Sequence, residues 1–177
     1  MENQPQFPAE EVSLPSKGLL YSKDSPLSKG FIEMKYMTAK EEDILTNANY
    51  IKNGTAIDKL LKSLIITPGI NYEDILIGDK NALMIAARVL GYGAEYKTKM
   101  NHPETGREVT GTIDLSKVKD KIIDPKIIKD GKNEFEFKLP ISKKTLGFKI
   151  LTHKDEKEID IELKKMKILN YFIKIKI

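Results

Sequence analysis

Few residues in this chain of 177 amino acids can do acid–base, nucleophilic or metal chemistry. Cysteine is absent, which excludes a thiol nucleophile, a disulfide framework, iron–sulfur ligation and every cysteine-based zinc site. The two histidines, His102 and His153, stand far apart in the sequence, and neither follows a serine in a nucleophile-elbow context. The sequence therefore indicates no metal site and no catalytic triad, and it leaves open only a hydrolase that pairs one histidine with distant carboxylates.

Glu41, Glu42 and Asp43 are consecutive carboxylates, a residue type that binds metals or transfers protons when the side chains converge. Consecutive positions of a helix point about 100° apart, so we expect these three side chains to diverge. They lie in the first turn of a predicted helix, where negative charge is favourable at the positive end of the helix dipole. We therefore expect a structural role.

The sequence contains no glycine-rich phosphate-binding motif of the P-loop or dinucleotide type. Gly91-Tyr92-Gly93 follows a predicted helix rather than a strand, which is the wrong context for such a loop. In Gly78-Asp79-Lys80-Asn81 we expect Asp79 to cap the helix that begins there. The sequence predicts no catalytic residue, no cofactor and no metal, and it favours a protein that is not an enzyme.

Hydrophobic residues make up 40% of the chain, enough for the core of one domain or of two small ones. No run approaches the roughly 20 apolar residues that a membrane helix needs. Residues 1–5 have neither the basic opening nor the apolar centre of a secretory signal. We expect an intracellular soluble protein without a membrane partner.

Basic residues concentrate toward the C-terminus. Residues 1–115 hold 13 basic and 16 acidic residues, a net charge of −3, whereas residues 116–177 hold 17 basic and 10 acidic residues, a net charge of +7. A nucleic-acid-binding module in this basic third is the alternative function. The lysines alternate with Asp and Glu, as in residues 154–158, and only Arg88 and Arg107 are arginines, so a solvated surface is favoured over a nucleic-acid site.

Pattern and turn residues predict the following elements. Residues 1–11 are expected to form a flexible arm. Short extended pieces broken by turns follow, including Leu19–Tyr21. Residues 31–37 alternate as a half-buried strand with Ile32, Met34 and Tyr36 on one face. A capping box at Thr38 and Glu41 begins a helix to about Lys52. Further helices are expected from Thr55, with Ile57 on the apolar stripe, and over residues 80–90, the latter as the central buried helix.

Two hairpins follow, with strands over residues 96–100 and 109–115 and then around residues 135–139 and 146–150. A helical stripe runs from Asp155 to about Phe172, where Ile159, Leu163, Met166, Leu169 and Ile173 recur, and the last six residues also fit a strand. The predicted fold class is α+β: a central cluster of about three helices in residues 39–90, flanked by an extended N-terminal strand region and two β-hairpins, with a C-terminal helix. The core is residues 12–115, and residues 116–177 belong to it or form a small second subdomain.

Three stretches carry a family likeness: residues 14–21 with Ser25-Pro26-Leu27, residues 34–46, and residues 78–93. In this order and at this spacing they resemble the baseplate hub assembly proteins of T4-like tailed phages. The likeness covers about residues 12–115, and the hairpin that ends in Ile113-Asp114-Leu115 fits the same pattern.

The resemblance implies a viral protein made in the cytoplasm of the infected cell that helps to build the hub of a contractile-tail baseplate. It would bind hub proteins as an assembly chaperone or as a minor structural subunit of the virion, without a small-molecule substrate. Six polar and aromatic residues of the three stretches are expected to contact the partner: Lys17, Tyr21, Lys35, Lys40, Arg88 and Tyr92. For Arg88, an ion pair within the chain or a solvent-facing position is the alternative.

Overall fold

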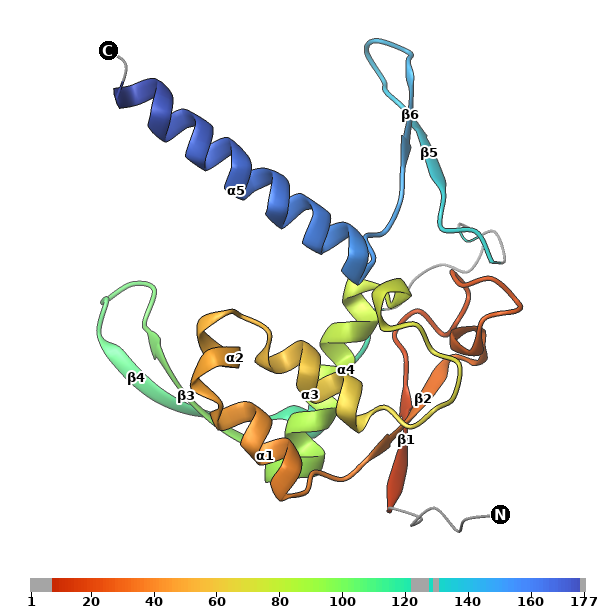
Figure 1. Ribbon diagram of the computed structural model, residues 1–177. Helices are drawn as coiled ribbons and strands as arrows, with labels where there is room; N and C mark the ends of the chain where they lie inside the picture. The colour runs from red at the N-terminus through yellow and green to blue at the C-terminus, as the bar shows by residue number, and fades with distance from the viewer. Residues whose placement is uncertain (1–7, 122–127, 129–130, 176–177) are drawn as a thin grey trace.

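The computed structural model describes residues 8–121, 128 and 131–175, and the side chains of its last helix as far as Met166. Figure 1 shows a body of short helices and a small sheet, from which two hairpins and one long helix extend. The elements are β1 (Ala9–Ser13), η1 (Pro26–Lys29), β2 (Phe31–Lys35), α1 (Ala39–Thr46), α2 (Ala48–Lys52), α3 (Ala56–Leu64), η2 (Tyr72–Asp74), α4 (Ile77–Tyr92), β3 (Glu95–Asn101), β4 (Glu108–Asp114), η3 (Leu115–Lys117), β5 (Phe135–Lys138), β6 (Thr145–Phe148) and α5 (His153–Ile175). This confirms the predicted α+β class.

β1 pairs with β2 as an antiparallel hairpin. Because β1 begins at Ala9, the end of the stretch expected to be an arm is a strand, whereas residues 1–7 lie outside the described residues. Ile32 and Met34 of β2 are fully buried, as the alternation predicts. Tyr36, expected on the same face, is instead exposed, because the strand ends at Lys35.

Residues 14–30 form a loop that the backbone closes, since the Leu14 N–H donates to the carbonyl of Gly30 over 2.8 Å. Leu19–Tyr21, expected to be extended, form turns instead, because the N–H of Leu19 bonds to the Ser16 carbonyl and that of Tyr21 to the Gly18 carbonyl. Gly18 has a φ of 76°, and a Cβ there would overlap the carbonyl oxygen of Ser28. Only glycine fits this position without displacing the backbone.

The helix predicted from residue 38 to about 52 is two helices. Its start is as predicted, because the Glu41 carboxylate accepts hydrogen bonds from the Thr38 N–H and hydroxyl in a capping box. Asn47 then breaks the helix: its side chain accepts from the N–H groups of Asn49 and Tyr50 and so caps α2.

The core lies between the β1–β2 hairpin, α3 and one face of α4. α3 contributes Leu60, Leu61 and Leu64, but Ile57, expected on the same stripe, is exposed. α4 begins at Ile77, earlier than predicted, and its buried residues are Asp79, Leu83 and Ala87. The prediction of a central buried helix therefore holds for one face only, because the other faces of α4 reach the surface.

Three elements extend from this body: the β3–β4 hairpin, the β5–β6 hairpin and α5 (Figure 1). Both hairpins confirm the predicted alternation, with Tyr96 opposite Ile113 and Phe137 opposite Leu146. α5 continues to Ile175, so the alternative of a terminal strand is wrong for the residues that the structure describes. None of the described helices is long and apolar enough to cross a membrane.

Candidate protein-binding surface

The consecutive carboxylates 41–43 do not converge. Glu42 and Asp43 are exposed, whereas Glu41 is fully buried and receives hydrogen bonds from Lys35 at 2.9 Å and Ser63 at 2.6 Å. Burial alone would raise the pKa of Glu41, but the hydrogen bonds from Ser63, Thr38 and Lys35 outweigh it and lower the pKa to about 2. Glu41 therefore stays ionised at neutral pH and joins β2, α1 and α3, which confirms the structural interpretation.

Asp79 is also buried, and it does not cap α4, because the residue at the helix start is Leu76. Its carboxylate accepts from the Ser16 N–H at 2.9 Å, the Ser16 hydroxyl at 2.7 Å and the Tyr21 hydroxyl at 2.6 Å. Burial and the nearby Asp79 charge raise the pKa of Tyr21 far above its ordinary value, so the phenol stays a donor. The capping prediction failed because hydroxyls from a distant loop reach this carboxylate.

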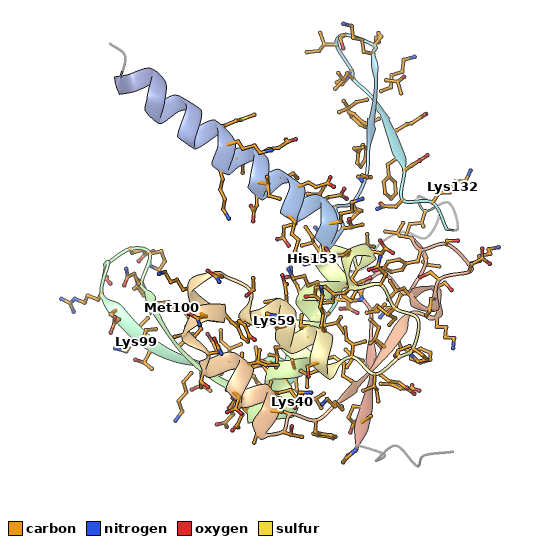
Figure 2. The ribbon with its side chains drawn as sticks, in the orientation of Figure 1. Lys40, Lys59, Lys99, Met100, Lys132 and His153 are labelled. Atoms are coloured by element: carbon orange, nitrogen blue, oxygen red, sulfur yellow. The ribbon has the colours of Figure 1, made fainter. Side chains whose placement is uncertain are left out.

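His153 is buried where α5 meets the body (Figure 2). The Lys80 ammonium lies 3.0 Å from His153 Nδ1, 3.3 Å from Asp58 Oδ1 and 3.1 Å from Glu156 Oε2. Because an ammonium only donates, Nδ1 accepts from it. The cluster holds the base of α5 against α3 and α4, and this role was not visible from the sequence.

These clusters bring no set of catalytic groups into an open cleft. Across the described residues, no three His, Asp or Glu side chains are arranged to hold a metal ion. His102 lies in the exposed turn between β3 and β4, whereas His153 is buried at the base of α5, so the structure does not unite the two histidines. The polar clusters around Glu41, Asp79 and His153 join distant elements and hold the fold together.

An open apolar groove of about 190 Å³ lies between α1, α3 and α4. Two of its exposed residues are Ile57 and Met84, with 40% and 38% of their surface accessible, and Tyr92 at its edge is 52% exposed. The other lining residues are Met37, Leu45, Leu60, Leu61, Ala87 and Arg88. This surface is almost entirely side-chain carbon and sulfur, which water solvates poorly.

Arg88 connects the groove to the β3–β4 hairpin. Its guanidinium carbon lies 5.2 Å from the centre of the Tyr92 ring and 5.9 Å from that of Tyr96. It also donates to the backbone carbonyls of Gly93 at 2.8 Å and Glu95 at 3.2 Å. These are bonds within the chain but not the ion pair given as the alternative, and through them Arg88 fixes the direction in which β3 leaves α4.

One face of the β3–β4 hairpin continues the apolar surface beyond Tyr96. Alternate residues of a strand share a face, so Tyr96 and Met100 lie beside their cross-strand neighbours Ile113 and Val109. All four are between 40% and 47% exposed. We call the groove and this hairpin face together the apolar patch.

A comparison with known protein families matches residues 19–168 to the family described as T4 bacteriophage base plate protein. The chain belongs to this family. Comparisons with curated proteins and with solved structures gave no match. The resemblance seen in three stretches of sequence is thereby confirmed: this is a bacteriophage base plate protein, and its family membership implies that other structural proteins of the phage are its partners.

The base plate family match extends the resemblance. It runs beyond residue 115 through the β5–β6 hairpin and most of α5, so all three projecting elements belong to the matched region. The basic C-terminal third is therefore part of the family and not an unrelated addition.

The six residues expected to contact a partner fall into three environments in this base plate protein. Tyr21 and Lys35 are buried and bond to Asp79 and Glu41 inside the chain. Lys17 and Lys40 are exposed, and Lys17 pairs with Asp120 at 3.0 Å. The structure brings together Arg88 and Tyr92, at the edge of the groove.

Sequence reasoning missed Ile57, Met84 and the outward face of the β3–β4 hairpin. Ile57 fits the apolar stripe of α3, so its pattern predicts burial, and Met84 lies in an apolar run of α4. One feature of the sequence could have revealed this surface. α4 carries apolar side chains on more faces than one core-facing stripe requires, so some of them must be exposed.

Proposed function

We propose that this base plate protein acts in building the hub of the contractile-tail baseplate, by binding hub proteins of the same phage through the apolar patch. It works as an assembly chaperone or as a minor structural subunit, and not as an enzyme. Family membership supports the baseplate setting. The exposed apolar patch is the observation that supports binding as its mode of action.

The composition of the patch supports a protein partner. Tyr, Met and Arg are enriched in the buried centres of protein interfaces, and Lys and Glu are depleted there. Met84, Met100, Tyr92 and Tyr96 supply such residues around Arg88. A contiguous exposed apolar surface of this kind marks an interaction site in a soluble protein.

Arg88 and Tyr92 are the proposed contacts at the centre of this interface, because both line the groove. Arg88 lies beside both tyrosine rings, and with two N–H groups bonded to backbone carbonyls it keeps further N–H donors for a partner's carbonyl or carboxylate. Lys40 and Lys17, which are exposed, are proposed contacts of the interface rim, where single charges contribute little to affinity.

Capture of a tagged chain from infected cells tests the proposal. The wild-type protein should retain hub proteins, and Ile57→Asp or Met84→Asp should reduce their recovery at least about tenfold, since each buries a carboxylate in the interface. Ile141→Asp is the matched control, because Ile141 is 95% exposed at the tip of the β5–β6 hairpin, away from the patch. If all variants recover hub proteins equally and keep the wild-type melting temperature, the apolar patch is not the binding surface.

Quantitative mass spectrometry separates the two roles. A minor subunit is present at a fixed ratio to hub proteins in purified virions, whereas a chaperone occurs in lysate complexes and is lost from the finished particle. No tail-protein partner in either sample would contradict the proposal.

Nucleic-acid binding by the basic C-terminal third remains the alternative function. Within the described residues, some of its lysines are paired: Lys149 with Asp155 at 2.8 Å and Lys157 with Glu73 at 3.0 Å. A nucleic-acid module would bind DNA or RNA with an affinity that falls steeply as salt rises, because neutralised phosphates release counterions. We expect at most weak binding that moderate salt abolishes.

A further inference from the structure

α5 is anchored to the body at its N-terminal end. Polar contacts of its first two turns hold it to the body: Lys80 bonds to His153 and Glu156, and Lys157 bonds to Glu73. From Glu158 to Met166 every residue is exposed, and Figure 1 shows the rest of the helix leading away from the body. A 23-residue helix is about 35 Å long, far longer than the two turns that contact the body.

The exposed part carries a coiled-coil seam. Ile159, Leu163 and Met166 follow one another at intervals of four and three, and they are between 41% and 58% exposed. In the sequence the same alternation continues through Asn170 and Ile173. Apolar residues repeating every 3.5 positions on average pack against an identical stripe of another helix, and one polar Asn in such a stripe selects register and oligomeric state.

The charges of α5 are divided between its two halves. Residues 153–163 contain two lysines and five carboxylates, a net charge of −3. Residues 164–177 contain five lysines and no carboxylate, a net charge of +5. Side by side in parallel, two such helices would face like charge with like, whereas in antiparallel each acidic half lies against a basic half.

We propose that α5 binds the α5 of a second copy of this chain as an antiparallel coiled coil centred near Met166. The seam supplies the apolar contact, and the divided charge supplies the orientation. Because each body is attached at the N-terminal end of its helix, the two bodies lie at opposite ends of the pair and do not collide. The interface is two-fold symmetric and therefore closes as a dimer. This inference does not rest on the proposed function.

Another apolar residue, Ile161, lies on the opposite side of α5 from the seam and provides a control position. Two positions along a helix turn the side chain by about 200°, so Ile161 faces away from both Ile159 and Leu163. It is about as exposed as Leu163. A substitution at Ile161 thus also replaces an exposed apolar residue of α5, but it changes the opposite face of the helix.

Light scattering on the purified full chain tests the association. The molar mass should rise with concentration from 20.1 kDa toward twice that value. Met166→Asp should weaken the dimer at least about tenfold, and Ile161→Asp by less than about twofold. A wild-type chain that stays monomeric at every concentration, or a dimer lost through Ile161→Asp alone, would overturn the proposal.

Cross-linking tests the orientation, because the chain has no cysteine and one introduced thiol is the only one present. A short bismaleimide should join two copies of Met166→Cys near the centre of the pair. It should not join two copies of Ile159→Cys, which antiparallel packing separates by roughly 20 Å along the axis. Efficient cross-linking through Ile159→Cys would show a parallel pair and overturn the proposal.

Discussion

The hydroxyl of Tyr21 donates a 2.6 Å hydrogen bond to Asp79 Oδ2 across 58 positions of the sequence, and it accepts another from the Leu76 N–H at 3.0 Å. One phenol thereby fixes the loop of residues 14–30 to the first turn of α4. The Asp79 carboxylate is buried, so bulk water cannot take the place of the Tyr21 hydroxyl if this hydrogen bond is removed.

Tyr21→Phe should lower the free energy of unfolding by about 1–3 kcal/mol, because it removes a donor from a buried carboxylate. Tyr36→Phe is the matched control: its hydroxyl donates to Glu10 at 2.7 Å, but at an exposed site, so its loss should lower the free energy of unfolding much less than Tyr21→Phe. Urea denaturation of both variants measures the difference. Equal losses would show that the Asp79 bond does not hold the loop.

Gly18→Ala should be strongly destabilising, by about 3 kcal/mol or more, because the new Cβ combines a positive φ with overlap of the Ser28 carbonyl. Gly54→Ala has nearly the same φ but no atom within 4 Å, so it should cost only about 1–2 kcal/mol. Thermal unfolding of the pair separates the overlap from the strain, and a Gly18→Ala protein no less stable than Gly54→Ala would contradict the tight turn.

Glu41 should make stability fall in acid. Its pKa is lowered from 4.5 to about 2 in the folded protein, so between these pH values the unfolded chain binds more protons. The contribution, on the order of 3 kcal/mol, is present above pH 4.5 and is lost as pH falls toward 2. Glu41→Gln should flatten this slope, measured by urea denaturation at each pH. The exposed neighbour Glu42→Gln serves as control, and an unchanged slope in Glu41→Gln would refute the linkage.

Lys80→Met should release α5. The substitution keeps most of the unbranched side chain but leaves Asp58 and Glu156 without their shared cation. Such a loss at a largely buried site costs on the order of 3 kcal/mol. Cleavage by trypsin near Lys154 should become faster. The control Lys62→Met removes an exposed ion pair with Glu73 and should leave cleavage unchanged. If both variants resist trypsin like the wild type, the cluster does not anchor α5.

Elements with a local signal were predictable from sequence. The capping box at Thr38, the two later hairpins and α5 all follow from patterns a few residues long, which the structure keeps. The break at Asn47 was missed because its side chain caps a new helix inside a continuing apolar pattern. Local sequence rules do not decide whether Asn47 continues one helix or caps a second one.

Two residues of the candidate site could be predicted from the sequence, but the groove could not. Arg88 and Tyr92 were identified because their residue types are unusual in an apolar stretch. The groove itself depends on how α1, α3 and α4 pack, and that packing leaves Ile57 and Met84 at the surface although their spacing predicts burial. Likewise, Asp79 and His153 meet their partners over 58 or more positions of sequence, beyond the reach of any local pattern.

We propose that the apolar patch binds hub proteins while the baseplate is being built. The most direct test is electron microscopy of particles from cells infected with phage in which this gene is interrupted, with the protein supplied from a plasmid. The wild type and Ile141→Asp should restore complete baseplates, whereas Met84→Asp should leave hubs incomplete although the protein is folded and abundant. Normal baseplates without the gene, or full restoration by Met84→Asp, would contradict the account.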